Sequence, residues 1–492
     1  MMDRVTSFLK AYKYELFAFG LALVSSLLVI TLTKLRFPND DQFILYRYID
    51  NIAFGHGFVF NIGERVLGST TPLFTLVGAA FKVLLPWVNT PALVAGLNVI
   101  FFSLSAISFY QLSKRFLPQN FALLALVVFC LNLSRMIPEG METPLFLLAI
   151  LVFLNVLFAK RYKLSAILLA IALLVRPDAG LIAVLVAIYW YQKKGLKWTV
   201  ILTGITIATA LPWLAFSWLY FHTIIPQSLA TKIHFNDIVY QTRYQALKVQ
   251  LSHLSRIYWG RIFDPAQIPL QVLLNLLPFV ALVGVGIKRI ITKDTWLLFA
   301  IPLAYLVSYS ISNPVMYPWY LNQVEPFWIL LSIAGVASVY QKTKQQYLKI
   351  ALIALIVAGP LCQWGYYLTT PSAGSKTTFF AVGDYLKDKV QPNESIGMSN
   401  IGIVGYITNA RVEDFIGLIN NYAVDYYPTP RTCLTNDQLY VVPPALVQAK
   451  QPEWLIIGDN EMDACFAQSD WFKTQYTLEH KEDVFGIYKR TH

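Results

Sequence analysis

Charged residues are scarce in this chain of 492 residues. Only 14% are charged, against ~25% in soluble domains, while 56% are hydrophobic and the mean hydropathy is +0.52. A soluble fold does not bury so much apolar side chain, whereas a lipid bilayer does. The aromatic content of 15%, with 12 Trp and 28 Tyr, fits side chains that anchor at membrane interfaces. The composition therefore excludes a soluble protein and predicts an integral membrane protein.

Acidic residues are rarest before residue 371. Residues 1–370 contain 29 Lys and Arg against 13 Asp and Glu, whereas residues 371–492 contain 10 against 15. The overall charge of +11 is therefore a sign of membrane topology, and we expect membrane lipids, not nucleic acid, as the partner of the basic residues. The four cysteines, at positions 130, 362, 433 and 465, lack the spacing of metal ligands.

Apolar runs predict eleven transmembrane spans. They lie at 16–34, 91–112, 120–133, 143–159, 164–176, 179–192, 198–221, 270–287, 294–312, 321–340 and 349–369. The first run has no small-residue cleavage site before charge resumes, so we expect a retained signal anchor. Arg176-Pro177-Asp178 separates two short runs, and a single helix with a proline kink stays an alternative there.

Basic clusters fall in alternate gaps between these spans. Placing all of them in the cytoplasm is self-consistent with eleven spans. This predicts a multi-pass inner (cytoplasmic) membrane protein with a cytoplasmic N-terminus and a periplasmic or extracellular C-terminal part. Ten of the 13 carboxylates before residue 371 would then lie on the outer face. Those near span ends are costly without a partner.

The first outer loop, residues 35–90, is too long for a connector and too apolar to be disordered. Asp40 and Asp41 open an amphipathic helical pattern that also carries Arg47, and Asn39 or Asp40 could cap this helix. Two adjacent acids followed by an Arg exceed what a cap requires. We interpret one group of acids as a functional site: Asp40, Asp41, Glu142 and Asp178. Solvated loop acids suffice to explain Asp50, Asp237 and Asp264.

The stretch from Asp40 to Pro72 resembles the first outer loop of lipid-dependent glycosyltransferases of the GT-C superfamily. It looks closest to the mycobacterial-type terminal arabinofuranosyltransferase branch. The shared features are the acidic pair, an aromatic-Arg-Tyr at 46–48, Gly-His-Gly-aromatic-Val-aromatic-Asn at 55–61 and Gly-Glu-Arg-Val at 63–66. Further landmarks follow in the same order: Gly140-Met141-Glu142-Thr143, Arg176-Pro177-Asp178, Pro226 with Ala230 and Lys232, and positions between Asn400 and Leu418. Gln227 and Ser228 depart from the family's Asn-Thr.

The resemblance implies an inverting glycosyltransferase. It would move a sugar from a polyprenyl-phosphate donor to a hydroxyl of a cell-envelope glycan, glycolipid or protein on the outer face. The acceptor hydroxyl needs a carboxylate base, which by resemblance is Asp40, with Asp41 as co-base, orienter or metal ligand. Adjacent carboxylates raise each other's pKa unless a cation neutralises them. Arg47 could supply that charge, as could a divalent cation (Mg, Mn or Ca) bound by Asp41 and Glu142.

The departing phosphate also needs a cation. Lys232 matches the family position and Arg176 is a second candidate, although either could instead snorkel to lipid headgroups. The residues expected to contact or support the substrate are Arg47, His56, Glu64, Arg65, Glu142, Asp178, Tyr317, Trp319 and Tyr320. The aromatic cluster at 317–320 is either an interface belt or a stacking wall for a sugar or prenyl chain. We expect Glu325 to pair with an Arg, and His222, His234 and His253 to be interfacial.

The predicted domains are a transmembrane GT-C-like catalytic domain, 1–369, and a soluble α/β domain, 370–492. Within the first, loop 35–90 would be catalytic and loop 222–269 would lie on the donor-phosphate side. In the second, we expect helices at 377–390 and 443–449 and strands at 395–407, 454–458 and 485–488. Cys433 and Cys465 could form a disulfide on the oxidising side of the membrane.

Two other classes of function stay open. A transporter or flippase of lipid-linked sugars would place ionisable groups at the bilayer midplane and often contain repeated spans, whereas here the acids lie in loops and no repeat is found. A membrane-anchored scaffold would leave the acidic first loop unexplained. Among enzymes, an oligosaccharyltransferase is disfavoured because Trp-Trp-Asp is missing. A protein O-mannosyltransferase or a lipid A aminoarabinose transferase fits the first loop less well.

Overall fold

A computed structural model describes most of the chain. The described residues are 12–33, 39–238, 245–259, 269–312, 314, 316–369, 374–427, 429, 442–459, 465–466 and 469–491. The chain divides into two compact units, and each is described by itself. Unit 1 comprises Met1–Arg36, Val94–Pro212 and Thr242–Thr370, and unit 2 comprises Phe37–Leu93, Trp213–Gln241 and Pro371–His492.

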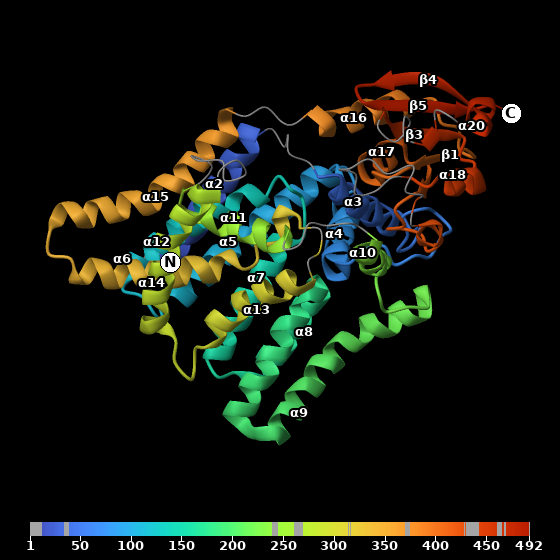
Figure 1. The fold of residues 1–492 in the computed structure, drawn as a ribbon. Coiled ribbons are helices and arrows are strands. Elements are labelled where there is room, and N and C mark those ends of the chain that lie inside the picture. The colour runs from blue at the N-terminus through green and yellow to red at the C-terminus, as the bar shows by residue number, and fades with distance from the viewer. Residues whose placement is uncertain are drawn as a thin grey trace, which may run out of the picture. The chain divides into compact units, whose positions relative to one another are not determined.

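Unit 1 is built from helices (Figure 1). These are α2 (Lys13–Thr33), α5 (Thr90–Ser113), α6 (Gln119–Leu133), η1 (Ser134–Met136), α7 (Thr143–Phe158), α8 (Tyr162–Val175), η2 (Pro177–Ala179), α9 (Gly180–Phe221), α11 (Gln245–Trp259), α12 (Pro269–Ile290), α13 (Leu297–Ser312), η3 (Pro318–Tyr320), α14 (Glu325–Lys342) and α15 (Gln346–Thr369). The first residues of α5 and the last of α9 belong to unit 2.

A helix occupies the greater part of each predicted span. α9 contains two of the predicted spans. They meet at Gly195, whose positive φ of 76° interrupts the helical geometry. The kinked-helix alternative for 164–192 is wrong, since α8 ends at Val175 and α9 begins at Gly180. α11 lies in a stretch for which the sequence predicted only a loop.

Four helical stretches of the described chain are long and apolar enough to cross a membrane. They are Lys13–Thr33, Thr90–Ser113, Gln119–Met136 and Pro177–Phe221, and shorter apolar helices such as Thr143–Phe158 accompany them. Large apolar side chains along α9, among them Val200 and Leu219, are exposed. Such surfaces need lipid or protein cover. The chain is therefore a polytopic α-helical membrane protein, as predicted.

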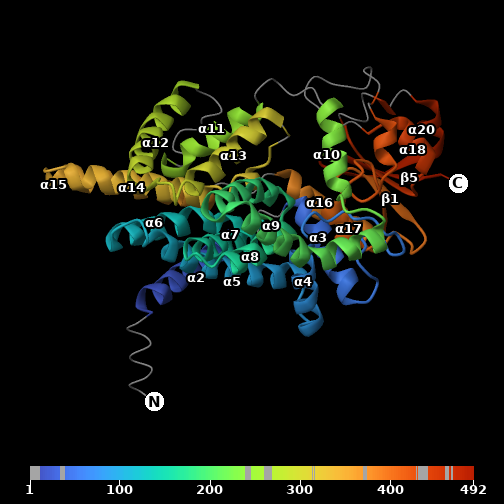
Figure 2. The same cartoon turned by 90° about the horizontal axis from the view of Figure 1, so that it is seen from below.

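Glycine allows α12 and α14 to pack at backbone contact, and the two helices meet at an angle in Figures 1 and 2. A Cβ atom on Gly286 would lie 1.7 Å from the carbonyl oxygen of Leu331, and one on Gly335 would lie 2.0 Å from that of Leu282. Small residues at such crossings are typical of membrane helices, where van der Waals packing replaces the hydrophobic effect.

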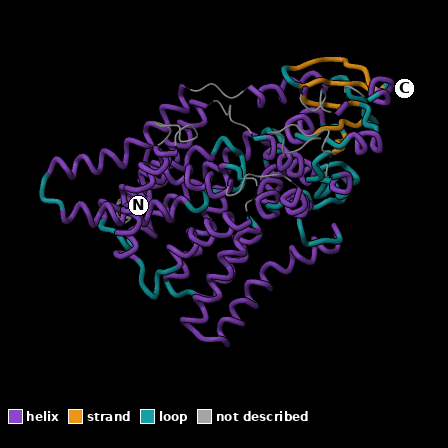
Figure 3. The backbone as a smooth tube through the Cα atoms, in the orientation of Figure 1, coloured by secondary structure: helices purple, strands orange, loops and turns teal. Residues whose placement is uncertain are grey.

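Unit 2 contains α3 (Asp40–Ala53), α4 (Pro72–Leu84) and α10 (Gln227–Ile238) together with a C-terminal α/β region. That region contains α16 (Gly374–Leu386), β1 (Ser395–Met398), α17 (Ile401–Thr408), β2 (Arg411–Asp414), η4 (Ala423–Tyr426), α18 (Pro444–Lys450), β3 (Trp454–Gly458), α20 (Asp470–Gln475), β4 (Tyr476–Glu482) and β5 (Phe485–Arg490). The strands, which are orange in Figure 3, form one sheet with the order β2-β1-β3-β5-β4. β1 runs parallel to β2 and β3, whereas β5 runs antiparallel to β3 and β4. The predicted α/β domain is thus confirmed.

One predicted strand of this region is wrong. Only Ser395–Met398 of the run 395–407 is a strand, and Ile401–Thr408 forms α17. A continuous apolar run has no period that separates a buried strand from a buried helix. α17 crosses between the parallel strands β1 and β2 and packs against α3. Cys465 is disulfide-bonded, and its predicted partner Cys433 lies outside the described residues.

The compact units divide the chain differently from the predicted domains. Both divisions place a boundary close to residue 370, but unit 2 groups the first outer loop and residues 213–241 with the C-terminal region. Unit 2 brings together segments that are far apart in the sequence, such as α3 and α17, which pack against each other. Hydrogen bonds between these segments involve predicted site residues.

Candidate functional site

Asp40 lies in the first turn of α3, and the N-terminus of α17 binds its carboxylate. The amide of Gly402 donates to Oδ2 at 2.9 Å and the amide of Ile403 donates to Oδ1 at 2.8 Å. A Cβ atom on residue 402 would lie 1.9 Å from the carbonyl oxygen of Asp40, so this contact requires glycine. Burial raises the pKa of Asp40 to about 6, against the two amide bonds, with smaller contributions from Asp41 and Asp414.

Asp40 is not the N-cap residue of α3. Asn39 is the N-cap residue of α3, and its side chain makes no capping hydrogen bond. The carboxylate of Asp40 instead serves the N-terminus of a different helix. Asp41 follows in the same turn and is partly buried.

Arg47, on α3, binds the C-terminal end of α17. Its Nη1 donates to the carbonyl of Gly405 at 2.8 Å and its Nη2 to the carbonyl of Ala410 at 2.7 Å. The guanidinium also stacks on Phe60, 4.3 Å from the ring centre. Only 3% of Arg47 is exposed, and this desolvation lowers its pKa to about 10. Arg47 therefore binds α17, whereas the sequence suggested that it could neutralise the acidic pair.

Asp414, at the end of β2, organises a loop in the same unit. Its carboxylate accepts hydrogen bonds from the amides of Ile416, Leu418 and Ile419. Burial outweighs these bonds and raises its pKa to about 6. The carbonyl of Leu418 would lie 3.0 Å from a Cβ atom on Gly68, so this loop packs directly on the loop of residues 35–90.

Helix α10, which carries Lys232, is attached to both of these segments. The amide of Gln227 donates to the carbonyl of Leu67 at 2.7 Å, and Oγ of Ser228 donates to the carbonyl of Gly68 at 3.1 Å. Oγ1 of Thr231 donates to the carbonyl of Gly417 at 2.6 Å. The two positions that depart from the family pattern, Gln227 and Ser228, thus fix α10 to the first loop. Lys232 itself is exposed.

The remaining predicted residues of the first loop take different positions. His56 is exposed in a turn between Gly55 and Gly57, which both have positive φ. Glu64 accepts from Arg411 at 2.9 Å. Arg65 lies over the ring of Tyr220, 4.6 Å from its centre.

Asp50 is not a freely solvated loop acid. It accepts a hydrogen bond from the hydroxyl of Thr90, and Lys82 lies 3.9 Å away. Burial raises its pKa. The interpretation of Asp50 as a solvated acid is therefore wrong, although nothing in its contacts suggests a catalytic role.

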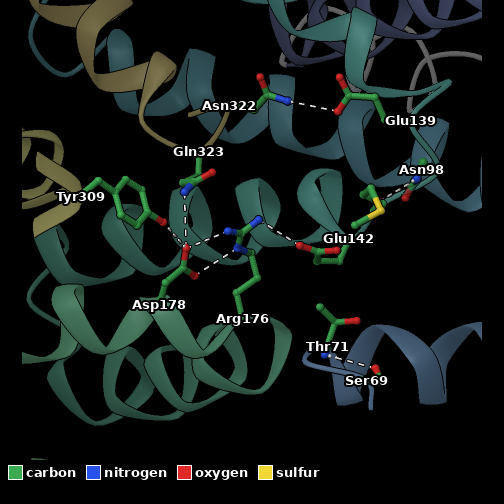
Figure 4. Close-up of polar contacts among 11 residues, drawn as sticks. Ser69, Thr71, Asn98, Glu139, Glu142, Arg176, Asp178, Tyr309, Asn322 and Gln323 are labelled. Carbon is green, nitrogen blue, oxygen red and sulfur yellow. Dashed lines mark hydrogen bonds and ion pairs between the residues drawn. The ribbon is translucent and has the colours of Figure 1, made fainter. Parts of the chain in front are cut away.

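In unit 1, the structure brings Glu142, Arg176 and Asp178 together (Figure 4). Nη1 of Arg176 donates to Glu142 Oε1 at 2.9 Å, while Nε and Nη2 form a bidentate pair with Asp178 at 3.0 and 2.7 Å. The hydroxyl of Tyr309 donates to Asp178 at 3.1 Å and Gln323 donates to the same oxygen at 3.4 Å. Two carboxylates thus more than neutralise Arg176 in the structure.

The aromatic cluster is close to these charges. Tyr317 and Trp319 are stacked with centroids 4.6 Å apart, and Tyr320 meets both rings edge-on. The ring centroids of Tyr320 and Tyr309 are 6.2 Å apart, and the hydroxyl of Tyr309 donates to Asp178. This arrangement connects the cluster to Asp178, while both predicted roles of the cluster stay predictions.

Unit 1 contains a second buried ion pair, formed by Arg135 and Glu325. Arg135 binds Glu325 at 3.0 Å and Asn322 at 2.9 Å, and Nε2 of His253 lies 3.2 Å from Glu325. Asn322 also donates to Glu139 (Figure 4). The predicted Glu325–Arg pair is confirmed. The interfacial interpretation of His253 is wrong, since its side chain is only 13% exposed and faces a buried carboxylate.

The described residues contain no group of three or more His, Cys, Asp or Glu side chains arranged to hold a metal ion. Glu142, one predicted metal ligand, uses Oε1 on Arg176, while Asp41 belongs to the other unit. A divalent cation between them stays a prediction.

The predicted site residues therefore form two sets. Unit 2 contains Asp40, Asp41, Arg47, His56, Glu64, Arg65 and Lys232, and unit 1 contains Glu142, Arg176, Asp178, Tyr317, Trp319 and Tyr320. Convergence of the two sets stays a prediction. Sequence reasoning missed Asp414, Tyr309, Gln323 and Arg135. Of these, only Asp414 carried a signal, because the resemblance includes it without a role.

Comparison with protein families identifies the C-terminal region alone. Residues 368–488 match a family described as "Domain of unknown function (DUF8728)". No curated protein matches the chain.

Solved structures similar to the chain cover nearly all of it. ArnT from Cupriavidus metallidurans bound to undecaprenyl phosphate has a TM-score of 0.59 and 11% identity, over 97% of this chain and 98% of ArnT. The oligosaccharyltransferase AglB from Archaeoglobus fulgidus, in complex with an inhibitory peptide and a dolichol-phosphate, has a TM-score of 0.58 and 10% identity, over 98% and 75%. An apo oligosaccharyltransferase from the same organism has a TM-score of 0.59 and 11% identity, over 93% and 71%.

At such low identity the likeness shows the fold. The protein is therefore a polytopic helical membrane protein with a small C-terminal sheet region, and it shares its GT-C-like fold with ArnT and AglB.

Proposed function

We propose that the protein is an inverting glycosyltransferase that uses a polyprenyl-phosphate-linked sugar. The acceptor is a hydroxyl of a cell-envelope glycan, glycolipid or protein on the outer face of the cytoplasmic membrane. The fold supports this function, as do the lipid phosphates bound to ArnT and AglB. One observation carries it: the acidic pair of α3 lies in a region where hydrogen bonds join α17 to Asp40, α10 to the first loop, and α10 to the Asp414 loop.

The chemistry assigns a role to each part of this region. The phosphate of the donor is already a leaving group, so the enzyme must deprotonate the acceptor hydroxyl and stabilise the departing charge. A carboxylate of the pair Asp40 and Asp41 takes the acceptor proton as its oxygen attacks the anomeric carbon. The bond to the phosphate oxygen breaks in the same step, which inverts the anomeric centre.

Lys232 is the cation proposed for the departing phosphate. Arg176 is the weaker candidate, since Glu142 and Asp178 already occupy its guanidinium. We propose instead that Arg176 holds the junction between α8 and α9. Arg47 keeps α17 in place, and His56, Glu64 and Arg65 support the first loop.

The motif of the first loop favours the arabinofuranosyltransferase branch, so a pentofuranosyl donor is the first to test. A divalent cation at Asp41, the cytoplasmic N-terminus and the outer C-terminal region are parts of the same proposal. The aromatic rings at 317–320 would stack on the sugar or the prenyl chain.

The test is sugar transfer by the purified protein in detergent. Synthetic short-chain polyprenyl-phosphate pentoses and hexoses serve as donors, and release of polyprenyl phosphate together with glycosylation of a hydroxyl acceptor is measured. The Asp40→Asn/Asp41→Asn double variant should lose transfer, whereas Asp294→Asn, which changes an exposed acid of unit 1, should keep it. Transfer that survives the double variant would exclude the acidic pair. A wild-type protein that is inert towards every donor yet moves intact lipid-linked sugar across liposomes would be a flippase.

A further inference from the structure

A pocket with a volume of about 760 Å³ lies between the first half of α9 and the turn that joins α12 to α13, all in unit 1. Leu185 and Ile188 of α9 give it an apolar lining, and Lys193 and Lys293 give it a basic one. Among the described residues, none of the predicted site residues lines this pocket. We infer that it binds the phosphate headgroup of an anionic membrane phospholipid, with an acyl chain lying along α9. The site does not depend on the proposed glycosyltransferase function.

The pocket lies where the chain turns back between predicted spans. Gly195, whose φ of 76° interrupts α9, comes just after Lys193, and the turn of residues 291–296 separates α12 from α13. A segment that leaves one span and enters the next lies at a membrane surface. The predicted topology assigns both turns to the cytoplasmic surface, where anionic lipids attract basic residues. An anionic headgroup is therefore the ligand that this position favours.

The basic lining of the pocket keeps a net positive charge. Nζ of Lys193 forms an ion pair with Asp294 and donates to the carbonyl oxygen of Lys293 at 2.8 Å. The ammonium group of Lys293 is exposed, and within the described part of the chain it has no hydrogen bond or ion pair. The hydrogen bond from Lys193 lowers the pKa of Asp294, and the charge of Lys160 adds to this effect. Three lysines near one carboxylate leave positive charge for a phosphate, whose oxygens accept charge-assisted hydrogen bonds from an ammonium group.

The apolar lining of the pocket fits an acyl chain. Ile188 is 45% exposed, and Val184, one helical turn earlier on the same face of α9, is 63% exposed. Exposed apolar surface of this kind on a predicted span needs lipid cover. Trp296 also lines the pocket, where its Nε1 donates to Oε1 of Gln192 at 3.1 Å, and tryptophan is typical of the membrane–water interface. Free phosphate would use the lysines alone, whereas a phospholipid uses both linings.

The test is a lipid titration of the full-length protein in detergent, followed by native mass spectrometry. Wild-type protein should bind phosphatidylglycerol more tightly than phosphatidylcholine with the same acyl chains. Lys293→Gln should weaken phosphatidylglycerol binding about fivefold, which is the contribution of one lysine beside an anionic headgroup, whereas Lys293→Arg should keep it. Lys344→Gln, which removes an exposed charge from the turn between α14 and α15, should also keep it. Equal affinity for the two lipids, or equal losses in Lys293→Gln and Lys344→Gln, would overturn the inference.

A second pair of variants tests the acyl chain. Ile188→Ser should weaken binding of dioleoyl-phosphatidylglycerol and leave binding of the short-chain dihexanoyl lipid unchanged. Ile207→Ser, which changes an exposed isoleucine of α9 that does not line the pocket, should affect neither lipid. Inorganic phosphate should not displace the dioleoyl lipid. Displacement by phosphate, or equal behaviour of the two serine variants, would make the pocket a site for free anions and overturn the lipid assignment. Lipid binding is measured without sugar transfer, so an inert enzyme would overturn the proposed function and not this inference.

Discussion

Replacement of Arg176 by methionine separates two roles for this residue. The sequence suggested that Arg176 binds the donor phosphate, whereas its guanidinium lies between Glu142 and Asp178 in the structure. The side chains of Arg176 and Glu142 are only 8% and 5% exposed. The methionine keeps most of the packing against Phe146, over whose ring the guanidinium lies, and removes the charge.

The expected loss of stability depends on the charges that stay buried after the substitution. Removing one partner of a buried ion pair costs ~3–5 kcal/mol, because the other charge stays buried without compensation. Arg176→Met leaves two carboxylates in that position. The matched control is Lys193→Met, whose partner Asp294 is 73% exposed. An ion pair that is exposed to solvent contributes little to stability, because water and salt screen it.

The assay is the free energy of unfolding, or the melting temperature, of each variant in the same detergent. Arg176→Met should lose several times more stability than Lys193→Met, and the triple variant Arg176→Met/Glu142→Gln/Asp178→Asn should recover a large part of the loss. Donor KM is measured in parallel. Equal stability of the two single variants, together with a raised KM only in Arg176→Met, would refute the structural role and restore the phosphate role.

Three further predictions concern buried charges. Burial raises the pKa of Asp414 from 3.8 to about 6, so the folded state binds a proton between these pH values that the unfolded state lacks. The stability from this group should therefore rise by up to ~3 kcal/mol as the pH falls from 7 to 4, and melting temperatures at pH 7 and 5 should differ less in Asp414→Asn than in wild type. Arg135→Met should cost ~3–5 kcal/mol because Glu325 is 2% exposed, and a double-mutant cycle with Glu325→Gln should show strong coupling. Arg47→Met removes two charge-assisted hydrogen bonds worth ~1.5–3 kcal/mol each, so amide hydrogen exchange in α17 should be faster in this variant than in the wild type.

The helices of unit 1 could be predicted because each span carries its signal locally. A run of about 20 apolar residues between basic gaps identifies a membrane helix without knowledge of its neighbours. Gly195 lies at the basic gap that the sequence placed between two spans. The run 395–407 could not be resolved in this way, since its division into β1 and α17 depends on where each half packs.

The residues of the candidate site could be predicted from the sequence, whereas their contacts could not. The acidic pair and Arg47 stand out in the sequence, but their partners on α17 lie more than 350 residues away. No local pattern indicates which helix end will receive a carboxylate. The same limit applies to His253, whose partner Glu325 lies on another helix and could not be read from the spacing of the histidines.

Single-turnover sugar transfer tests the central claim most directly. Wild-type protein is mixed with a synthetic polyprenyl-phosphate pentose and a hydroxyl acceptor, and the anomeric configuration of the product is determined by NMR. The proposed mechanism predicts an inverted product from wild type and a rate at least ~10²-fold lower from the Asp40→Asn/Asp41→Asn double variant. A retained configuration, or an unchanged rate in the double variant, would contradict it.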